Sequence, residues 1–165
     1  FGPYFRKCSE LLKPDGAMLI QAITIADQRY EAYRKSVDFI QRYIFPGGCL
    51  PSLGAIFRSV GRVTDMRPVY LGDLADHYAR TLEHWRRRFL ANIDRIRALG
   101  FSEEFLRLWE YYFCYCEAGF RERVIGDVHL LLSKPKCRLS DDSSVEASVS
   151  QNDSARRTIP GRVGS

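Results

Sequence analysis

The chain has 165 residues, 45% hydrophobic and 13% aromatic, which is enough apolar surface for one buried core and too much for a polypeptide disordered throughout. A formal charge of +5 favours an anionic partner, either nucleic acid or an anionic membrane surface, and charge alone does not choose between them. No apolar run approaches the roughly 20 residues of a membrane-spanning helix, and the five irregularly spaced cysteines indicate reduced thiols in the cytosol and no metal site.

The first residues predict a helix followed by a strand. The apolar residues of 3–12 lie on one helical face, and Pro14 and Gly16 then force a turn. Residues 17–25 are a nearly continuous apolar run, typical of a strand whose two sheet faces are both covered by helices. The run has one long polar residue, Gln21, which periodicity alone favours as a buried amide hydrogen-bonded to neighbouring backbone.

A second helix is expected over 27–44, with Asp27 as its N-cap and an apolar stripe at steps of three and four. It ends in residues 45–52, a rigid turn with two prolines that lack an N–H and two glycines that permit positive φ. Ser52 is then expected to cap a shorter helix that runs through Phe57.

Residues 66–71 have the partly alternating pattern of a strand, in which Pro68 predicts an edge position or the beginning of the strand. Two longer amphipathic helices are expected over 78–96 and 105–120, separated by a helix stop at Gly100.

A final strand over 124–133 completes the predicted body of the chain, which we take as one folded unit over 1–135. Residues 136–165 contain no aromatic side chain, carry charges of both signs and show no sustained hydrophobic period. They are therefore expected to form a disordered tail.

Read with the residues from Asp38 to Ile44 before it, the rigid turn closely resembles the DFI-x-x-YIFPGGCLPS signature of cyclopropane-fatty-acyl-phospholipid synthases, which are S-adenosylmethionine-dependent methyltransferases. Matches to that family continue in chain order over almost the whole body: YFR and LLKPDG in 4–16, IQAITI in 20–25, HYARTL in 77–82 and YYFCYCEAGFR in 111–121. The resemblance implies an α/β fold, namely the C-terminal half of a class I methyltransferase (Rossmann-like) open sheet with helical lipid-binding insertions.

The resemblance implies a methylene transfer to the double bond of an unsaturated phospholipid acyl chain, in which a bound bicarbonate accepts the released proton. Carried over by motif, the residues of the bicarbonate cage are Tyr78, Gln21 and the backbone amide of Ile23. Gln21 stands where many members have His. An amide N–H can still donate to an anion, but Gln cannot take up a proton as His can.

The family's acyl-binding tunnel maps onto five residues of this chain: Leu50, Pro51, Leu82, Tyr112 and Cys116. A tunnel wall is also core, so Cys116 is expected to be a small apolar wall residue and not a nucleophile. Aromatic faces near the reacting carbon would stabilise a passing cation.

The S-adenosylmethionine site is expected upstream of this chain. No Gly-rich turn from a strand to a helix occurs in the sequence, because Gly47 and Gly48 follow a predicted helix and lack the G-x-G spacing. The chain also lacks an initiator Met, so it is interpreted as a fragment that is inactive on its own.

Other functions remain open from the sequence. A fatty-acid C-methyltransferase that makes a methyl branch shares the same carbocation, and a noncatalytic basic interaction domain would keep the fold alone. A nucleic-acid module would rest on residues 86–88, three arginines on a solvent face, and is not favoured. We expect instead a cytoplasmic protein without nucleic-acid contacts that touches anionic membrane peripherally through these arginines and forms a homodimer.

Overall fold

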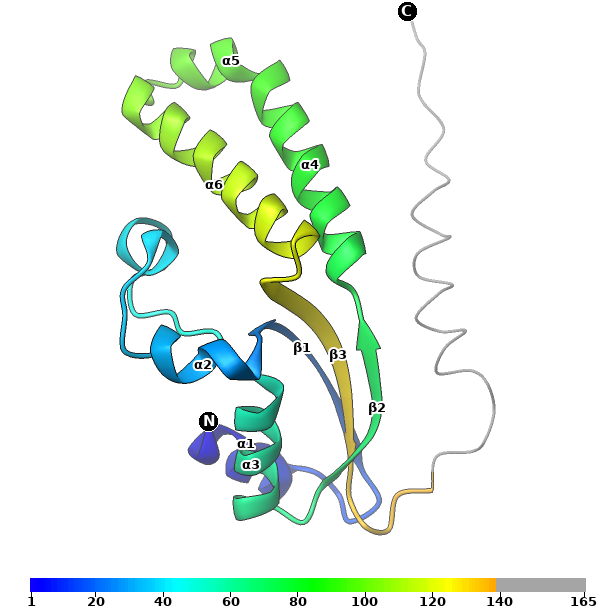
Figure 1. Cartoon of the computed structure of the whole chain (residues 1–165). Helices are drawn as coiled ribbons and strands as arrows, with labels where there is room; N and C mark the ends of the chain where they lie inside the picture. Colours follow the sequence, from blue (N-terminus) through cyan, green and yellow to red (C-terminus); the bar gives the residue numbers. More distant parts are fainter. Residues whose placement is uncertain (139–165) are drawn as a thin grey trace, which may run out of the picture.

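The computed structural model describes residues 1–138 as a small antiparallel sheet with helices on one face and a helical hairpin at one end (Figure 1). In chain order the elements are α1 Gly2–Leu11, β1 Ala17–Ile25, α2 Asp27–Tyr33, the π-helix η1 Ile40–Ile44, α3 Leu53–Val63, β2 Arg67–Asp73, α4 Ala75–Ala91, α5 Ile93–Ala98, α6 Glu103–Arg121 and β3 Ile125–Ser133. The predicted disordered tail lies outside the described residues from residue 139 onward.

The last strand of the chain, β3, lies between the other two, so the strand order is β1-β3-β2. Both pairings are antiparallel, and β3 sets Asp127 opposite Ile23 and His129 opposite Gln21. In β2 the register shifts between Pro68 and Tyr70. The edge position predicted from Pro68 is therefore confirmed, since an edge strand tolerates a residue without an N–H.

The expectation that helices cover both faces of the first strand is wrong for the described chain. Leu19 is 51% exposed, and the side chain of Gln21 is exposed rather than buried. α1 and α3 pack on the face of β1 that carries Met18, Ile20 and Ala22. On the opposite face Leu19 and Gln21 stay exposed, while Ile23 packs against the core between α4 and α6. Gln21 also finds its partner in a side chain, that of Asp127, and not in neighbouring backbone.

Two apolar cores hold these elements together. The first packs Phe5 of α1 and Val60 of α3 against Leu130 and Leu132 of β3. The second lies inside the α4–α6 hairpin, which stands beyond the end of the sheet in Figure 1. Leu82 is fully buried there, and burial of one such side chain contributes about 1.5–3 kcal/mol.

The single helix expected over 27–44 is replaced by α2 and η1. Asp38 and Gln41 exchange hydrogen bonds, since the Asp38 N–H donates to Gln41 Oε1 (2.9 Å) and the Gln41 N–H donates to Asp38 Oδ1 (2.8 Å). This reciprocal cap starts a new helical segment. Asp27 is not an N-cap of α2; its carboxylate accepts from the backbone N–H of Gly54 (3.0 Å) at the start of α3.

Three other helix ends can be compared with the predicted ones. Ser52 caps α3 as expected, accepting from the Ala55 N–H at 3.2 Å, but α3 continues past Phe57 to Val63. The helix predicted over 78–96 is interrupted at Asn92, whose side chain donates to the Arg88 carbonyl (2.8 Å). Gly100 has φ +88° and is the expected stop. Within residues 1–138, no helix is both long enough and apolar enough to cross a membrane.

Candidate functional site

A mostly apolar cavity of about 760 Å³ lies where the end of β1 meets α2, η1, α4 and α6. Five of the residues predicted for the cage and the tunnel line it together: Ile23, Leu50, Tyr78, Tyr112 and Cys116. They come from separate stretches of the chain, so the fold brings together what the sequence keeps apart. The volume lies in the range of small-molecule and lipid sites.

Three predicted residues do not line this cavity. Leu82 is fully buried in the α4–α6 core, one helical turn beyond Tyr78. The Pro51 carbonyl accepts from the Ile25 N–H (3.0 Å) and so holds the turn against the end of β1. Gln21 lies further along β1 and is hydrogen-bonded to Asp127.

Sequence reasoning missed several wall residues, among them Ile25, Tyr33, Phe45, Phe120 and Ile125. Tyr33 and Phe120 belong to stripes that were expected to face the core, and Phe45 belongs to the quoted signature. Periodicity identified Tyr33 and Phe120 as inward-facing but gave no sign that the space beside them is open.

Tyr78 lies in the first turn of α4, which is tied to the sheet by a hydrogen bond from the Leu74 N–H to the Asp127 carbonyl (2.7 Å). Its ring packs on Phe120 with 4.8 Å between ring centroids. Burial raises the pKa of the Tyr78 phenol, and the negative charge of Asp127 raises it further. The hydroxyl is therefore protonated at neutral pH and can donate a hydrogen bond.

Tyr112 and Cys116, one turn apart on α6, form an uncharged part of the wall. Burial raises the pKa of Tyr112 to about 12 and that of the Cys116 thiol to about 11. Both groups are neutral at pH 7, which suits contact with a hydrocarbon chain.

Asp127, which pairs with the cavity residue Ile23 in the β1–β3 ladder, is the most buried carboxylate of the described residues, with 1% of the residue exposed. Its Oδ2 accepts from Gln21 Nε2 at 2.7 Å, whereas Oδ1 has no hydrogen-bond partner among the described residues. Burial raises the pKa of this carboxyl, although the bond from Gln21 and the nearby His129 oppose the rise.

An aromatic rim, defined as Phe39, Tyr43, Phe45, Tyr111 and Tyr115, adjoins the cavity, which Phe45 and Tyr115 line. Phe39 meets Tyr111 edge to face at 4.6 Å and Tyr115 at 5.7 Å between centroids. Phe45 and Tyr115 line the cavity, yet they are 55% and 41% exposed. They therefore mark the place where the cavity opens to solvent.

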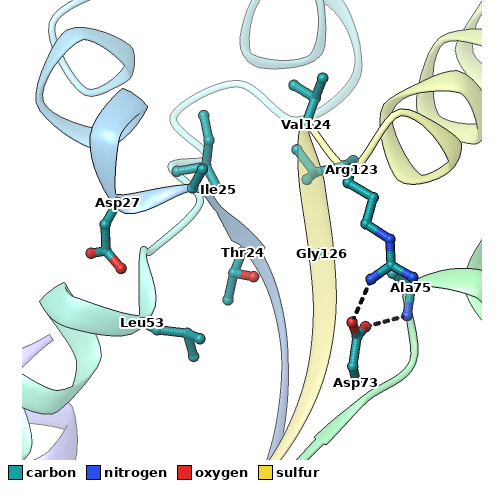
Figure 2. A pocket seen from close by; sticks show the side chains of 11 residues that line it. Thr24, Ile25, Asp27, Leu53, Asp73, Ala75, Arg123, Val124 and Gly126 are labelled. Carbon is teal, nitrogen blue, oxygen red and sulfur yellow. Dashed lines mark hydrogen bonds and ion pairs between the residues drawn. The ribbon is translucent and has the colours of Figure 1, made fainter.

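A second, smaller hollow of about 200 Å³ lies between the ends of the strands (Figure 2). Within it, Asp73 accepts from the Ala75 N–H (2.9 Å) and from Arg123 (2.9 Å). We assign it a structural role at the start of α4. Across the described residues 1–138, no group of three or more His, Cys, Asp or Glu side chains is placed to hold a metal ion.

Comparison with known proteins places these features in a family. Residues 1–130 match the family described as mycolic acid cyclopropane synthetase. The chain is 48% identical over 118 residues to the tuberculostearic acid methyltransferase of Mycobacterium tuberculosis, covering 72% of this chain and 28% of that protein. It is 36% identical over 126 residues to the cyclopropane-fatty-acyl-phospholipid synthase of Escherichia coli, covering 76% of this chain and 31% of that protein.

Solved structures of the same family have a similar fold. A crystal structure of a mycolic acid cyclopropane synthase complexed with SAH and CTAB has a TM-score of 0.71 and 28% identity, covering 81% of this chain and 49% of that one. A cyclopropane synthase from Mycobacterium tuberculosis has the same TM-score with 25% identity and the same coverage. The predicted α/β class I methyltransferase fold is thereby confirmed. This chain spans less than half the length of each of these proteins.

Proposed function

Because the chain belongs to the mycolic acid cyclopropane synthetase family, we propose that it forms the acyl-binding part of an S-adenosylmethionine-dependent lipid methyltransferase. The observation that carries this proposal is the cavity, where five residues expected from the family motifs share one apolar wall. An unsaturated phospholipid acyl chain would lie along Leu50, Tyr112 and Cys116, with its double bond near Tyr78.

Residues 1–138 contain no Gly-rich turn from a strand to a helix that would fit the methyl donor. The turn at Gly47 and Gly48 follows η1 and a bend instead of a strand, so it does not present backbone N–H groups at the start of a long helix. We therefore infer that S-adenosylmethionine, which supplies the methyl group, is held by residues of the full-length protein that lie outside this chain.

Within this chain, the cavity wall would exclude water from the carbocation that forms when the acyl π bond takes up the methyl group. The faces of Tyr78, Tyr112 and Phe120 can stabilise that cation through their π systems. A proton must then leave, either from the new methyl carbon or from a chain carbon next to the cation. In our proposal, Tyr78 donates a hydrogen bond to a bicarbonate that accepts it, with Gln21 and the Ile23 amide as further donors.

Two products are compatible with this wall. If the lost C–H electron pair closes a ring, the product is a cyclopropane, as in the synthases of the family. The second candidate is a methyl-branched acyl chain, favoured by the 48% identity to a protein named tuberculostearic acid methyltransferase. For the cyclopropane the proton leaves the new methyl carbon. For the branch it leaves a chain carbon next to the cation, whose C–H electron pair forms a double bond, so the branched product of this step keeps one double bond. The contacts made by Leu50 or Tyr112 are the same in both.

Lipid analysis of cells that express the full-length protein tests the proposal. Mass spectrometry should show unsaturated acyl chains that gain one carbon, labelled when the cells receive methyl-labelled methionine, and proton NMR separates ring from branch. A matched strain expresses the protein with Leu50→Trp, which fills the cavity and should lower the labelled fraction. Unlabelled lipids in both strains would favour the noncatalytic interaction domain instead.

A further inference from the structure

Asp127 is an unusual carboxylate for this protein because no Lys or Arg of the described residues forms an ion pair with it. Three other aspartates show the ordinary arrangement: Asp27 accepts from a helix N–H, Asp65 accepts from Lys134 and Ser9, and Asp73 pairs with Arg123. Each of those three is exposed. Asp127 is buried, accepts one hydrogen bond from a neutral amide, and leaves Oδ1 without a partner among the described residues.

A buried carboxylate that accepts only one hydrogen bond and has no ion-pair partner lowers the free energy of unfolding. A purely structural partner for Gln21 would be served better by Asn, which accepts the same bond without a charge. The burial of Asp127 and its single hydrogen bond therefore indicate a role for a side chain that can change between a charged and a neutral form.

The position of Asp127 connects it to the cage residues. It lies opposite Ile23 in the β1–β3 ladder, and Ile23 lines the cavity. Its side chain holds the amide of Gln21. Its charge also acts on Tyr78, since it raises the pKa of that phenol. One carboxylate thus contacts or influences every residue proposed to hold the anion.

Given the function proposed above, we propose that Asp127 is a positioning residue that controls anion binding: as the neutral acid it holds Gln21 while leaving the cavity open to an anion, and as the carboxylate it repels that anion. Bicarbonate affinity should then fall as Asp127 loses its proton. Gln21 cannot titrate, so this neighbour gives the cage a response to pH that the amide alone lacks.

The groups that face Asp127 set the pH at which this happens. Burial raises the pKa of the Asp127 carboxyl, and Asp73 on β2 adds to the rise, while Gln21 on β1 and His129 on β3 lower it. On α4 the neighbouring titratable group is Tyr78, which is neutral over the same range. Asp127 is therefore protonated at higher pH than an ordinary aspartate.

The test measures binding of carbon-13 bicarbonate to the full-length protein by NMR titration across a pH series, at a fixed bicarbonate concentration calculated for each pH. For the wild type we expect the dissociation constant to rise about tenfold per pH unit above the pKa of Asp127. Asp127→Asn should bind bicarbonate with an affinity that stays constant across the series. The control is Asp65→Asn, which removes a carboxylate paired with Lys134 and should keep the wild-type pH dependence.

Thermal melting separates this role from a structural one. Removing a buried charge should leave the melting temperature of Asp127→Asn unchanged or higher, whereas a structural carboxylate would leave it lower. A wild-type affinity that does not change with pH overturns the proposal without any variant, and so does an unchanged pH dependence in Asp127→Asn. Because binding is measured without turnover, these outcomes are distinct from failure to modify lipid, which would count against the proposed function alone.

Discussion

Burial of Cys116 beside Tyr112 keeps its thiol protonated, and this decides what the residue can do. The pKa of about 11 means that the thiolate forms only as the pH approaches 11, so at neutral pH roughly one thiol in ten thousand is ionised. A thiolate, not a thiol, is the nucleophile. Cys116 is thus suited to line an apolar tunnel and not to attack a substrate.

Alkylation with iodoacetamide checks this assignment. The exposed thiols of Cys49 and Cys114 should react at pH 7.5, whereas Cys116 should react only in strongly alkaline buffer, as read by peptide mass spectrometry. Cys116→Ala in the full-length protein should retain activity within a few-fold. Rapid labelling of Cys116 at pH 7.5, or complete loss of turnover in Cys116→Ala, would show that the thiol has a chemical role.

At the scale of elements, η1 and α6 together present the aromatic rim to solvent. Aromatic side chains with one apolar side and one wet side favour the interface of a membrane, and Arg42 lies 5.4 Å from the Tyr43 ring beside them. The arginines at 86–88 are less available than the sequence suggested, since Arg86 pairs with Glu117 and Arg87 with Glu83. Peripheral membrane contact through these arginines stays a prediction, to which the rim adds a second surface.

Liposome sedimentation compares the two surfaces. Tyr43→Ser with Phe45→Ser should weaken binding to anionic liposomes by several-fold, because two interfacial aromatics are lost. Arg86→Gln with Arg87→Gln, which removes ion-paired charges on α4, is the matched variant and should have a smaller effect. Binding by the wild type that ignores both salt and anionic lipid content would exclude the arginine surface, and unchanged binding by Tyr43→Ser with Phe45→Ser would exclude the rim.

The elements show what local sequence could and could not predict. The eight segments expected from periodicity, caps and turn residues overlap all ten helices and strands of the described residues, and the stop at Gly100 and the cap at Ser52 were also expected. The break between α2 and η1 was missed because the apolar stripe continues through it, while the Asp38–Gln41 cap that causes it has ordinary composition. Stripes report which side is buried and not whether the helix is continuous.

The candidate site could also be predicted only in part. Motif transfer found cavity residues such as Tyr78 and Cys116, but it gave Gln21 no partner. That partner is Asp127, separated from Gln21 by 106 residues, and it faces Gln21 only because β3 inserts between β1 and β2. A contact of this kind depends on sheet order, which no local pattern in one sequence reveals.

At the scale of the whole molecule, residues 1–138 carry the apolar cavity proposed to bind an acyl chain but no Gly-rich turn from a strand to a helix. The chain of 165 residues by itself should therefore give no binding heat with S-adenosylmethionine in calorimetry, while the full-length protein should bind it. Far-ultraviolet circular dichroism provides the control that the isolated chain is folded. Saturable binding to the folded chain would place cofactor residues within it and contradict this division.

The most direct test of the central claim is the initial rate of methyl transfer against bicarbonate concentration, measured for the full-length protein and for Tyr78→Phe. Loss of one hydrogen bond to an anion costs roughly 1.5–3 kcal/mol, so the rate should fall about ten- to hundred-fold. The melting temperature should not change, because the ring still packs on Phe120. Full activity in Tyr78→Phe across the bicarbonate range, or a loss that follows unfolding, would show that Tyr78 is a core residue and contradict the account.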